Sequence, residues 1–408
     1  MSAPNPLPST RVIHADATGE LRFSSRERVM IFAPHPDDES LAAAGLILAA
    51  RSAGAAVHVT YLTDGGNNPW AQLAMEGRWP RTPADRSRWG ERRRREAIRA
   101  LAVLGLDRSD ATFLGLPDQG LTPILLGADA LALGRVRRSL SRWVPTMVVT
   151  PSSLDRHPDH SAAALMVRLA LASSGRPEPI RLDYVLHARP HMGPRSRWVR
   201  LGRRERALKR AAILCHASQL RWRRFELPRF AREFESFEPA REAGLFEGEH
   251  PIGAACVFGE WIHLELQPER ADRLGPVVLR VLLEFGCGRV HALGLQLDGR
   301  RGLAPVRDAR GTLRAQADIR RVRGRLRAAI QLEASPRQCF LKLESPRRQR
   351  LGLFDPFGWR AVPVATCLRL MSGTESYLRP LDPVHANGNG ASRGREGAAA
   401  VPARVSES

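Results

Sequence analysis

One stretch, Val29–Ser40, reading VMIFAPHPDDES, constrains the fold more than any other part of the chain. It opens with an apolar run that is typical of a buried strand. The run ends at a proline, and one His and three acidic residues follow before an Ala- and Leu-rich segment, Leu41–Ala50, that predicts a helix. In open parallel α/β sheets, ligands bind at the carboxyl ends of the strands. The stretch therefore predicts an α/β sheet with a functional site at its edge.

The same order of strand, polar cluster and helix occurs a second time. Met147–Thr150 is a candidate buried strand, and His157-Pro158-Asp159-His160 follows it after a short loop. Zinc accepts His and Asp as ligands, and a catalytic zinc usually has three protein ligands and one open position for water. Neither cluster fills that set comfortably alone, whereas the two together do.

The two motifs resemble those of the PIG-L/LmbE-like family of zinc-dependent de-N-acetylases. That family includes the N-acetylglucosaminyl-phosphatidylinositol de-N-acetylase and the deacetylases of mycothiol and bacillithiol synthesis. Its A-H-P-D-D-E motif stands here as Pro34–Glu39, with Pro34 where Ala is usual, and its H-P-D-H motif stands unaltered as His157–His160. Two motifs in the right order, each after a predicted strand, are a specific signal. The resemblance extends over roughly the first 240 residues.

The resemblance implies an enzyme that hydrolyses an amide with Zn²⁺ as its cofactor. His35, Asp38 and His160 would be the metal ligands, and two imidazoles with one carboxylate leave the ion a net positive Lewis acid. Asp37, next to a ligand, would be the general base that deprotonates the attacking water and later returns the proton to the leaving amine. The implied substrate is an N-acetylated amino sugar.

The resemblance also assigns roles around the reacting carbonyl. His157 would stabilise the oxyanion, as an imidazolium or as an N–H donor, and Asp159 would orient His157. Glu39 is expected to support the ligands from behind. Asp155 stands where some relatives carry a Tyr that assists catalysis, so that help is missing or replaced here. Three further residues fall in family segments that border the pocket and are expected to contact substrate: Gly65, Arg93 and Asp118. Without the resemblance, we would interpret Arg93 as part of an exposed ion pair and Asp118 as the cap of a turn.

The order of the predicted elements indicates two folded parts. Strands and helices alternate in the first, which predicts a Rossmann-like, mostly parallel α/β sheet flanked by helices. Short segments separated by Gly, Pro and Asp follow, several of them alternating, and they predict a smaller antiparallel β-sandwich-like domain. The expected boundaries are a loosely ordered segment over 1–27, the deacetylase-like domain over 28–246, a β-rich accessory domain over 247–383 and a disordered tail over 384–408.

The net charge of +21 is typical of proteins that bind nucleic acid or anionic membranes. All but two of the 63 basic residues are Arg, however, and with abundant Ala this indicates a GC-rich genome rather than a designed basic face. Clusters such as Arg92–Arg95 would attract phosphate or lipid headgroups, and a solvated helix face is the plainer interpretation. We therefore expect no specific nucleic-acid partner, and a peripheral contact with an anionic membrane surface stays open.

Two other functions stay open on the sequence alone. One is the deacylation of a different N-acyl amide by the same site, and the other is a non-catalytic, Arg-rich module that binds nucleic acid or anionic surfaces. A dinucleotide-binding dehydrogenase is disfavoured, because no G-x-G-x-x-G follows the first strand. Five cysteines without a CxxC pair, no N-terminal signal peptide and no long apolar run suit a cytoplasmic protein.

Overall fold

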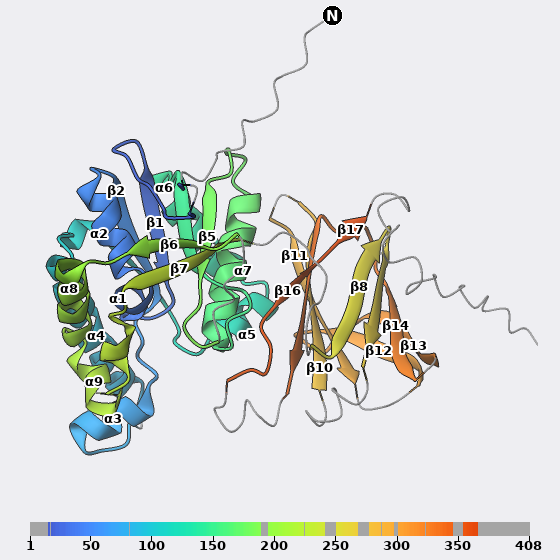
Figure 1. Ribbon diagram of the computed structural model, residues 1–408. Helices are drawn as coiled ribbons and strands as arrows, with labels where there is room; N and C mark the ends of the chain where they lie inside the picture. The colour runs from blue at the N-terminus through green and yellow to red at the C-terminus, as the bar shows by residue number, and fades with distance from the viewer. Residues whose placement is uncertain are drawn as a thin grey trace, which may run out of the picture.

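The computed structural model describes residues 15–16, 18–80, 82–188, 195–223, 225–240, 250–267, 277–286, 288–297, 301–322, 324–345 and 354–365. They form two bodies that lie side by side, an α/β body from the first half of the chain and a β body from the second (Figure 1). The tail expected over 384–408, and residues 1–14 of the expected N-terminal segment, lie outside the described residues.

The first body is built on a seven-stranded sheet in the order β3-β2-β1-β4-β5-β7-β6. The first five strands in this order pair in parallel, and β7 and β6 close the edge with antiparallel pairs. This confirms the predicted mostly parallel α/β sheet. The strands are β1 (Arg28–Ala33), β2 (Ala56–Thr63), β3 (Ala111–Leu116), β4 (Met147–Pro151), β5 (Ile180–Tyr184), β6 (Arg197–Arg200) and β7 (Phe234–Pro239).

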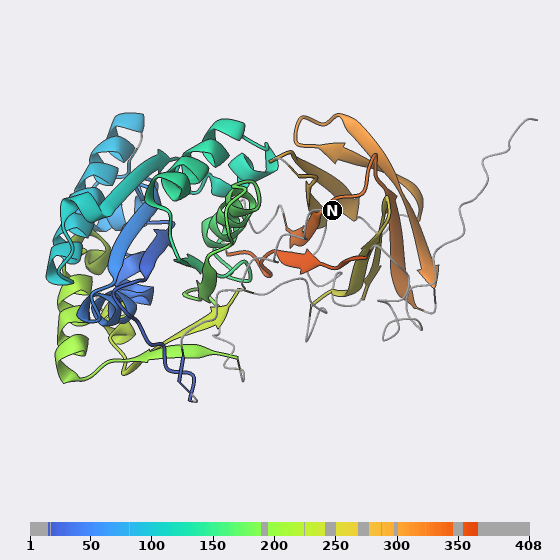
Figure 2. The ribbon, with the colours of Figure 1, turned by 90° about the horizontal axis from the view of Figure 1, so that it is seen from above.

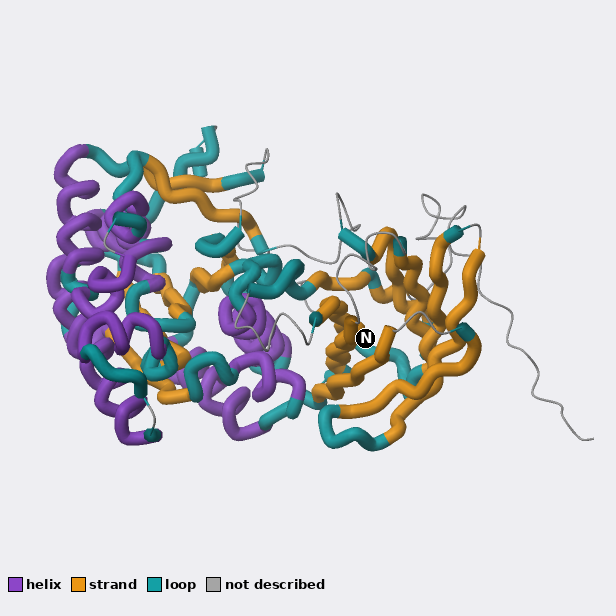
Figure 3. The backbone as a smooth tube through the Cα atoms, turned by 90° about the horizontal axis from the view of Figure 1, so that it is seen from below, coloured by secondary structure: helices purple, strands orange, loops and turns teal. Residues whose placement is uncertain are grey.

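Helices cover both faces of this sheet, and Figure 3 shows them gathered in the first body. They are α1 (Asp38–Ala42), α2 (Ala44–Ser52), α3 (Pro69–Glu76), α4 (Pro83–Val103), α5 (Leu121–Leu126), α6 (Ala130–Trp143), α7 (Pro158–Ala172), α8 (Arg203–Leu214) and α9 (Ala217–Arg223), with short 3₁₀ turns η1 (Arg108–Asp110) and η2 (Leu227–Phe230). None of the helices among the described residues is long and apolar enough to cross a membrane.

The central strand β1 shows why the sheet is covered on both sides. Successive side chains of a strand point to opposite faces. Val29 and Ile31 therefore pack with α1, α2, α4 and α8 on one face. Met30 and Phe32 pack with α5, α6 and α7 on the other. A strand buried on both faces must be apolar throughout, which is what the sequence run shows.

The second body is one continuous ten-stranded sheet in the order β16-β15-β10-β11-β12-β13-β14-β9-β8-β17. All neighbours pair antiparallel except β17 and β8, which pair in parallel. The strands are β8 (Ile252–Phe258), β9 (Trp261–Leu266), β10 (Val277–Glu284), β11 (Val290–Leu297), β12 (Gly302–Asp308), β13 (Leu313–Val322), β14 (Arg325–Gln331), β15 (Gln338–Glu344), β16 (Arg360–Val362) and β17 (Val364–Ala365).

The sheet of the second body curls until its two edges nearly meet, around its own apolar core (Figure 2). The edge strands β16 and β17 are separated in the chain only by Pro363, so this short segment draws the two ends together into a barrel-like shape. The sandwich expected from the sequence is not confirmed, because hydrogen bonding runs through all ten strands instead of dividing them into two sheets. Alternation predicts half-buried strands but does not say which strands pair.

Candidate active site

The two motifs lie side by side because β1 and β4 are neighbouring parallel strands. Each motif follows the carboxyl end of its strand and enters a helix: Asp37 is the N-cap of α1, and His157 is the N-cap of α7. In the sheet, β2 and β3 lie on one side of β1, whereas the later strands β4 and β5 lie on its other side. Such a switch in strand order leaves a crevice where open α/β sheets bind ligands.

The three ligands expected from the sequence come together at this crevice. Donor atoms of His35, Asp38 and His160 lie within 4.8 Å of one another, and all three side chains are buried. Oδ2 of Asp38 is 3.3 Å from Nδ1 of His35 and 3.3 Å from Nε2 of His160. Each ring nitrogen of His160 faces a carboxylate but makes no well-aligned hydrogen bond among the described residues, which is costly for buried polar atoms. The donor set therefore fits a metal ion, and its chemistry suits zinc.

The charge around these imidazoles also suits a cation. Burial disfavours a charged His160, but Asp38 and Asp155 nevertheless raise its pKa to about 9. Burial equally disfavours a charged Asp38, yet the neighbouring His160 and His35 hold the pKa of Asp38 well below its ordinary value. Asp38 is thus kept ionised inside a buried cluster, and a bound metal ion would offset its charge.

Asp118, expected to contact substrate, lies against a metal-ligand candidate. Its Oδ1 is 3.1 Å from Nε2 of His35, and its Oδ2 accepts a hydrogen bond of 2.7 Å from the backbone N–H of Asn67. With Nε2 of His35 turned toward Asp118, Nδ1 faces Asp38. Asp118 is therefore placed to orient the His35 ring, and its contact with substrate stays a prediction.

Asp155 does the same for the other imidazole, and sequence reasoning missed this. Its Oδ2 lies 3.5 Å from Nδ1 of His160 and accepts backbone hydrogen bonds from Leu186 and His187. Its Oδ1 accepts the backbone N–H of His157 at 2.9 Å. The available signal was an acidic residue two positions before the N-cap of α7, the helix that carries His160, because such residues commonly bind the helix N-terminus.

Asp37, the expected base, forms an ion pair of 2.9 Å with Arg93 on α4. Arg93 also donates to the backbone carbonyls of Pro36 and Gly65. Gly65 has φ +64°, and a Cβ there would lie 2.1 Å from Arg93 Nη1, so only glycine fits. Burial raises the pKa of Asp37 even though the guanidinium opposes the shift. Gly65 and Arg93 thus meet behind the base; their contact with substrate stays a prediction.

His157 is held by a different group from the one expected. Its Nδ1 accepts a hydrogen bond of 3.2 Å from the backbone N–H of Asp159, which leaves the proton on Nε2. Burial, with His160 and His35 nearby, holds the pKa of His157 well below its ordinary value, which favours an N–H donor over an imidazolium. The carboxylate of Asp159 instead accepts the backbone N–H groups of Gln119 and Leu121.

Glu39 supports the first motif from behind, as expected. Its side chain is fully buried, and Oε2 accepts the backbone N–H of Asp37 at 3.1 Å. Its Oε1 accepts the hydroxyl of Ser40 at 2.6 Å and lies 3.2 Å from Nε2 of His216. Glu39 therefore fixes the turn in which both Asp37 and Asp38 stand.

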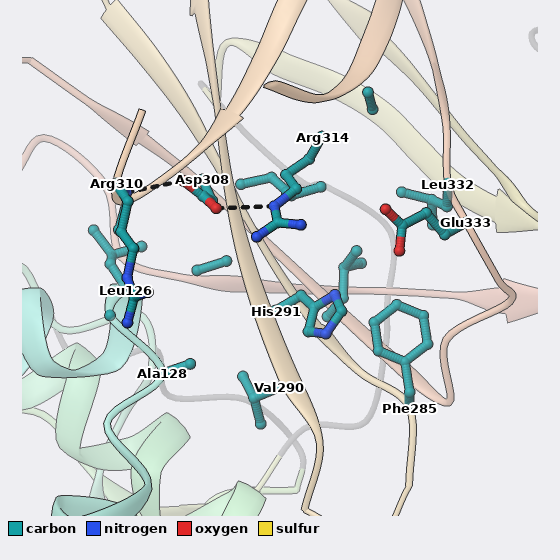
Figure 4. Close-up of a pocket in the computed structure, with 16 residues that line it drawn as sticks. Leu126, Ala128, Phe285, Val290, His291, Asp308, Arg310, Arg314, Leu332 and Glu333 are labelled. Carbon is teal, nitrogen blue, oxygen red and sulfur yellow. Dashed lines mark hydrogen bonds and ion pairs between the residues drawn. The ribbon is translucent and has the colours of Figure 1, made fainter. Parts of the chain in front are cut away.

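A cavity of about 290 Å³ lies apart from this cluster, between the end of α5 and strands of the second body (Figure 4). Leu126 and Ala128 line it from the first body, and Phe285 and His291 from the second. Asp308 and Arg314 form an ion pair of 2.9 Å at its wall. None of the site residues predicted from the sequence lines this cavity.

Comparisons with known proteins agree with the motifs. Residues 30–171, which include both of them, match the PIG-L family model, described as GlcNAc-PI de-N-acetylase. None of the curated proteins compared with the chain matches its sequence significantly.

The structure is similar to several solved structures. The A40926 pseudoaglycone deacetylase Dbv21 is 21% identical, with a TM-score of 0.41 over 52% of this chain and 97% of that one. The N,N'-diacetylchitobiose deacetylase of Pyrococcus horikoshii is 20% identical, with a TM-score of 0.41 over 52% and 83%. GalB, a 4-carboxy-2-hydroxymuconate hydratase of Pseudomonas putida, is 18% identical, with a TM-score of 0.38 over 56% and 99%.

Proposed function

We propose that this chain belongs to the PIG-L/LmbE-like family of metal-dependent deacetylases and is a zinc hydrolase that removes the acetyl group from an N-acetylglucosamine-type sugar. The sugar would be part of a glycoconjugate or a glycan precursor. The observation that carries the proposal is the buried cluster of His35, Asp38 and His160, with Asp37 and His157 on either side of it.

Zinc, when bound, would supply a Lewis acid that polarises the acetyl carbonyl and activates water. The residues around it divide the remaining work. Asp37 is buried against Arg93, and burial raises its pKa above the ordinary value of an aspartate. It would take the proton of the attacking water and pass it to the leaving amine. His157, with its proton on Nε2, would donate a hydrogen bond to the carbonyl oxygen as negative charge develops there.

The arginine run of α4 weakens the alternative of a basic binding module. Arg93 is buried and pairs with Asp37. Arg94 pairs with Asp64 at 2.6 Å, and its guanidinium stacks over Phe113. A surface that binds phosphates needs cations that project to solvent. These two arginines instead serve the fold and the site, so the hydrolase explains them better. A different N-acyl amide remains the second candidate substrate.

The test is the release of acetate from the zinc-loaded protein. N-acetylglucosamine and N,N'-diacetylchitobiose would be supplied, and acetate and the free amine would be quantified together. Asp37→Asn should lower kcat by about 10²–10⁴-fold while zinc content is kept. Asp318→Asn, which removes a half-buried carboxylate on β13 that pairs with Arg320 in the second body, is the matched control. Near-normal turnover in Asp37→Asn would show that the base is another residue.

A further inference from the structure

A segment of the second body is seated on the loop that carries the second motif. Residues 354–359 precede β16 and lie between the two bodies in Figures 1 and 2. The backbone N–H of Asp355 donates to the carbonyl of Arg156 at 2.9 Å, and Arg156 Nε donates back to the carbonyl of Asp355 at 3.1 Å. The backbone N–H of Trp359 donates to the carbonyl of Ser153 at 2.7 Å. These bonds join the segment to both ends of the loop before His157.

Residues 354–359 pack tightly against this loop, and a side chain of the second body fixes their position. Trp359 is fully buried. A Cβ on Gly358 would lie 2.2 Å from the carbonyl oxygen of Ser153, so a larger residue does not fit there. Lys342 of β15, itself buried, pairs with Asp355 at 2.5 Å. A buried charge pair of this kind specifies one position for the segment.

Phe354 is the part of this segment that reaches the site. Its ring centroid lies 5.3 Å from that of His157 and 4.9 Å from that of His187. The His187 ring in turn lies 4.7 Å from the ring of His160. Phe354 remains 41% exposed, whereas its neighbour Asp355 is buried. Part of the phenyl ring therefore contacts the two imidazoles, and the rest meets solvent.

We propose that Phe354 is a specificity-determining residue, and that through it the second body forms the wall of the acyl pocket. The inference rests on the proposed function, in which His157 donates to the carbonyl oxygen. The acyl substituent is bonded to that same carbonyl carbon. A ring packed against His157 at a tilt of 56° is therefore close to the acyl chain, where it contacts an acetyl methyl and blocks a longer chain.

The first test compares acyl chain lengths in hydrolysis. N-acetyl-, N-butyryl- and N-hexanoylglucosamine would be offered to the wild type, Phe354→Ala and Phe354→Leu. We expect the wild type to prefer acetyl, and Phe354→Ala to raise the hexanoyl-to-acetyl ratio of kcat/KM about tenfold or more, since a few methylene groups are worth that much in an apolar pocket. With the acetyl substrate, Phe354→Ala should lower kcat/KM mainly by raising KM. Phe354→Leu should lie between them.

The control is Phe234→Ala, which removes a phenylalanine of similar exposure (50%) on β7, whose ring lies under the Arg200 guanidinium. It should leave the ratio at the wild-type value. An equal ratio in Phe354→Ala, Phe354→Leu and Phe234→Ala would overturn the inference.

The second test needs neither a sugar nor turnover. Acetohydroxamate and hexanohydroxamate chelate zinc and carry their alkyl group in place of the acyl chain, so their Kd values would be measured by calorimetry on the zinc-loaded proteins. Phe354→Ala should shift the preference toward hexanohydroxamate about tenfold. A shift without hydrolysis of any N-acylglucosamine would support the inference and reject the proposed substrate. Hydrolysis with no change in either series would retain the proposed function and reject the role of Phe354.

Discussion

At the scale of single residues, each candidate imidazole ligand faces carboxylates with both of its ring nitrogens. Nδ1 of His35 faces Asp38, and its Nε2 faces both Asp118 and Asp159. His160 lies between Asp38 and Asp155 in the same way. A carboxylate behind a ligating imidazole fixes the ring and raises its basicity toward the metal. These contacts therefore describe one centre in which Asp118 and Asp155 are placed to orient the ligands.

Asp155→Asn should weaken zinc binding about 10–100-fold, because the amide keeps the shape of the side chain but loses the charge that supports His160. Competition with a chelator of known affinity would measure the change. Asp183→Asn is the control, since Asp183 is a carboxylate on β5 that binds Thr150 instead of a ligand. A zinc affinity equal to wild type in Asp155→Asn would contradict the orienting role.

The sequence could predict the residues of the centre but not their partners. His35 and Asp38 share one turn, and His160 follows a neighbouring strand, so motif spacing and strand order suffice to bring them together. The contact of Asp118 with His35 depends on a loop after β3, and the orienting group of His157 is a backbone N–H. Such contacts are set by side-chain direction and tertiary packing, which spacing along the chain does not encode.

At the scale of elements, a single glutamate joins three parts of the first body. The sequence predicts one helix over Leu41–Ala50, but the structure has α1 and α2, which meet at Ala43. Glu235 of β7 accepts the backbone N–H groups of Gly45 and Leu46 and pairs with Lys209 of α8 at 2.6 Å. The helix break was not predictable locally, because the group that binds the start of α2 comes from a distant strand.

Glu235→Gln should destabilise the protein by about 3–5 kcal/mol, because it leaves Lys209 charged and buried without its partner. Urea unfolding followed by circular dichroism would measure the loss. The control is Glu233→Gln, two residues before Glu235 in the chain. Glu233 forms an exposed ion pair with Arg200, so its loss should lower the free energy of unfolding by less than about 1 kcal/mol. Equal losses of unfolding free energy in the two variants would show that burial of the Lys209–Glu235 pair adds nothing to stability.

At the scale of the whole molecule, the two bodies share one apolar cluster. Helices α5, α6 and α7 pack against Leu282, Val290, Ala292, Phe340 and Trp359 of the second body. The sequence predicted two folded parts but did not identify the residues that join them. Within the second body, these residues have the same apolar character as any buried strand position. The shared cluster implies that the second body stabilises the first as well as bordering its site.

Trp359→Ala should therefore destabilise both bodies, by about 3–5 kcal/mol, as expected when a large buried aromatic is removed. Unfolding followed by far-ultraviolet circular dichroism and by tryptophan fluorescence should remain coincident in the wild type. Leu303→Ala, at a residue 73% exposed, is the control and should have little effect. Two separate transitions in the wild type would contradict a shared core.

The central claim is that His35, Asp38 and His160 hold one metal ion, and elemental analysis after zinc loading tests it most directly. The wild type and Asp37→Asn should each contain one zinc per chain, and Asp38→Ala should contain none. That pattern would separate the ligand from the base beside it without any assumption about substrate. A wild type that takes up no zinc, or an Asp38→Ala protein that keeps a full equivalent, would contradict the account.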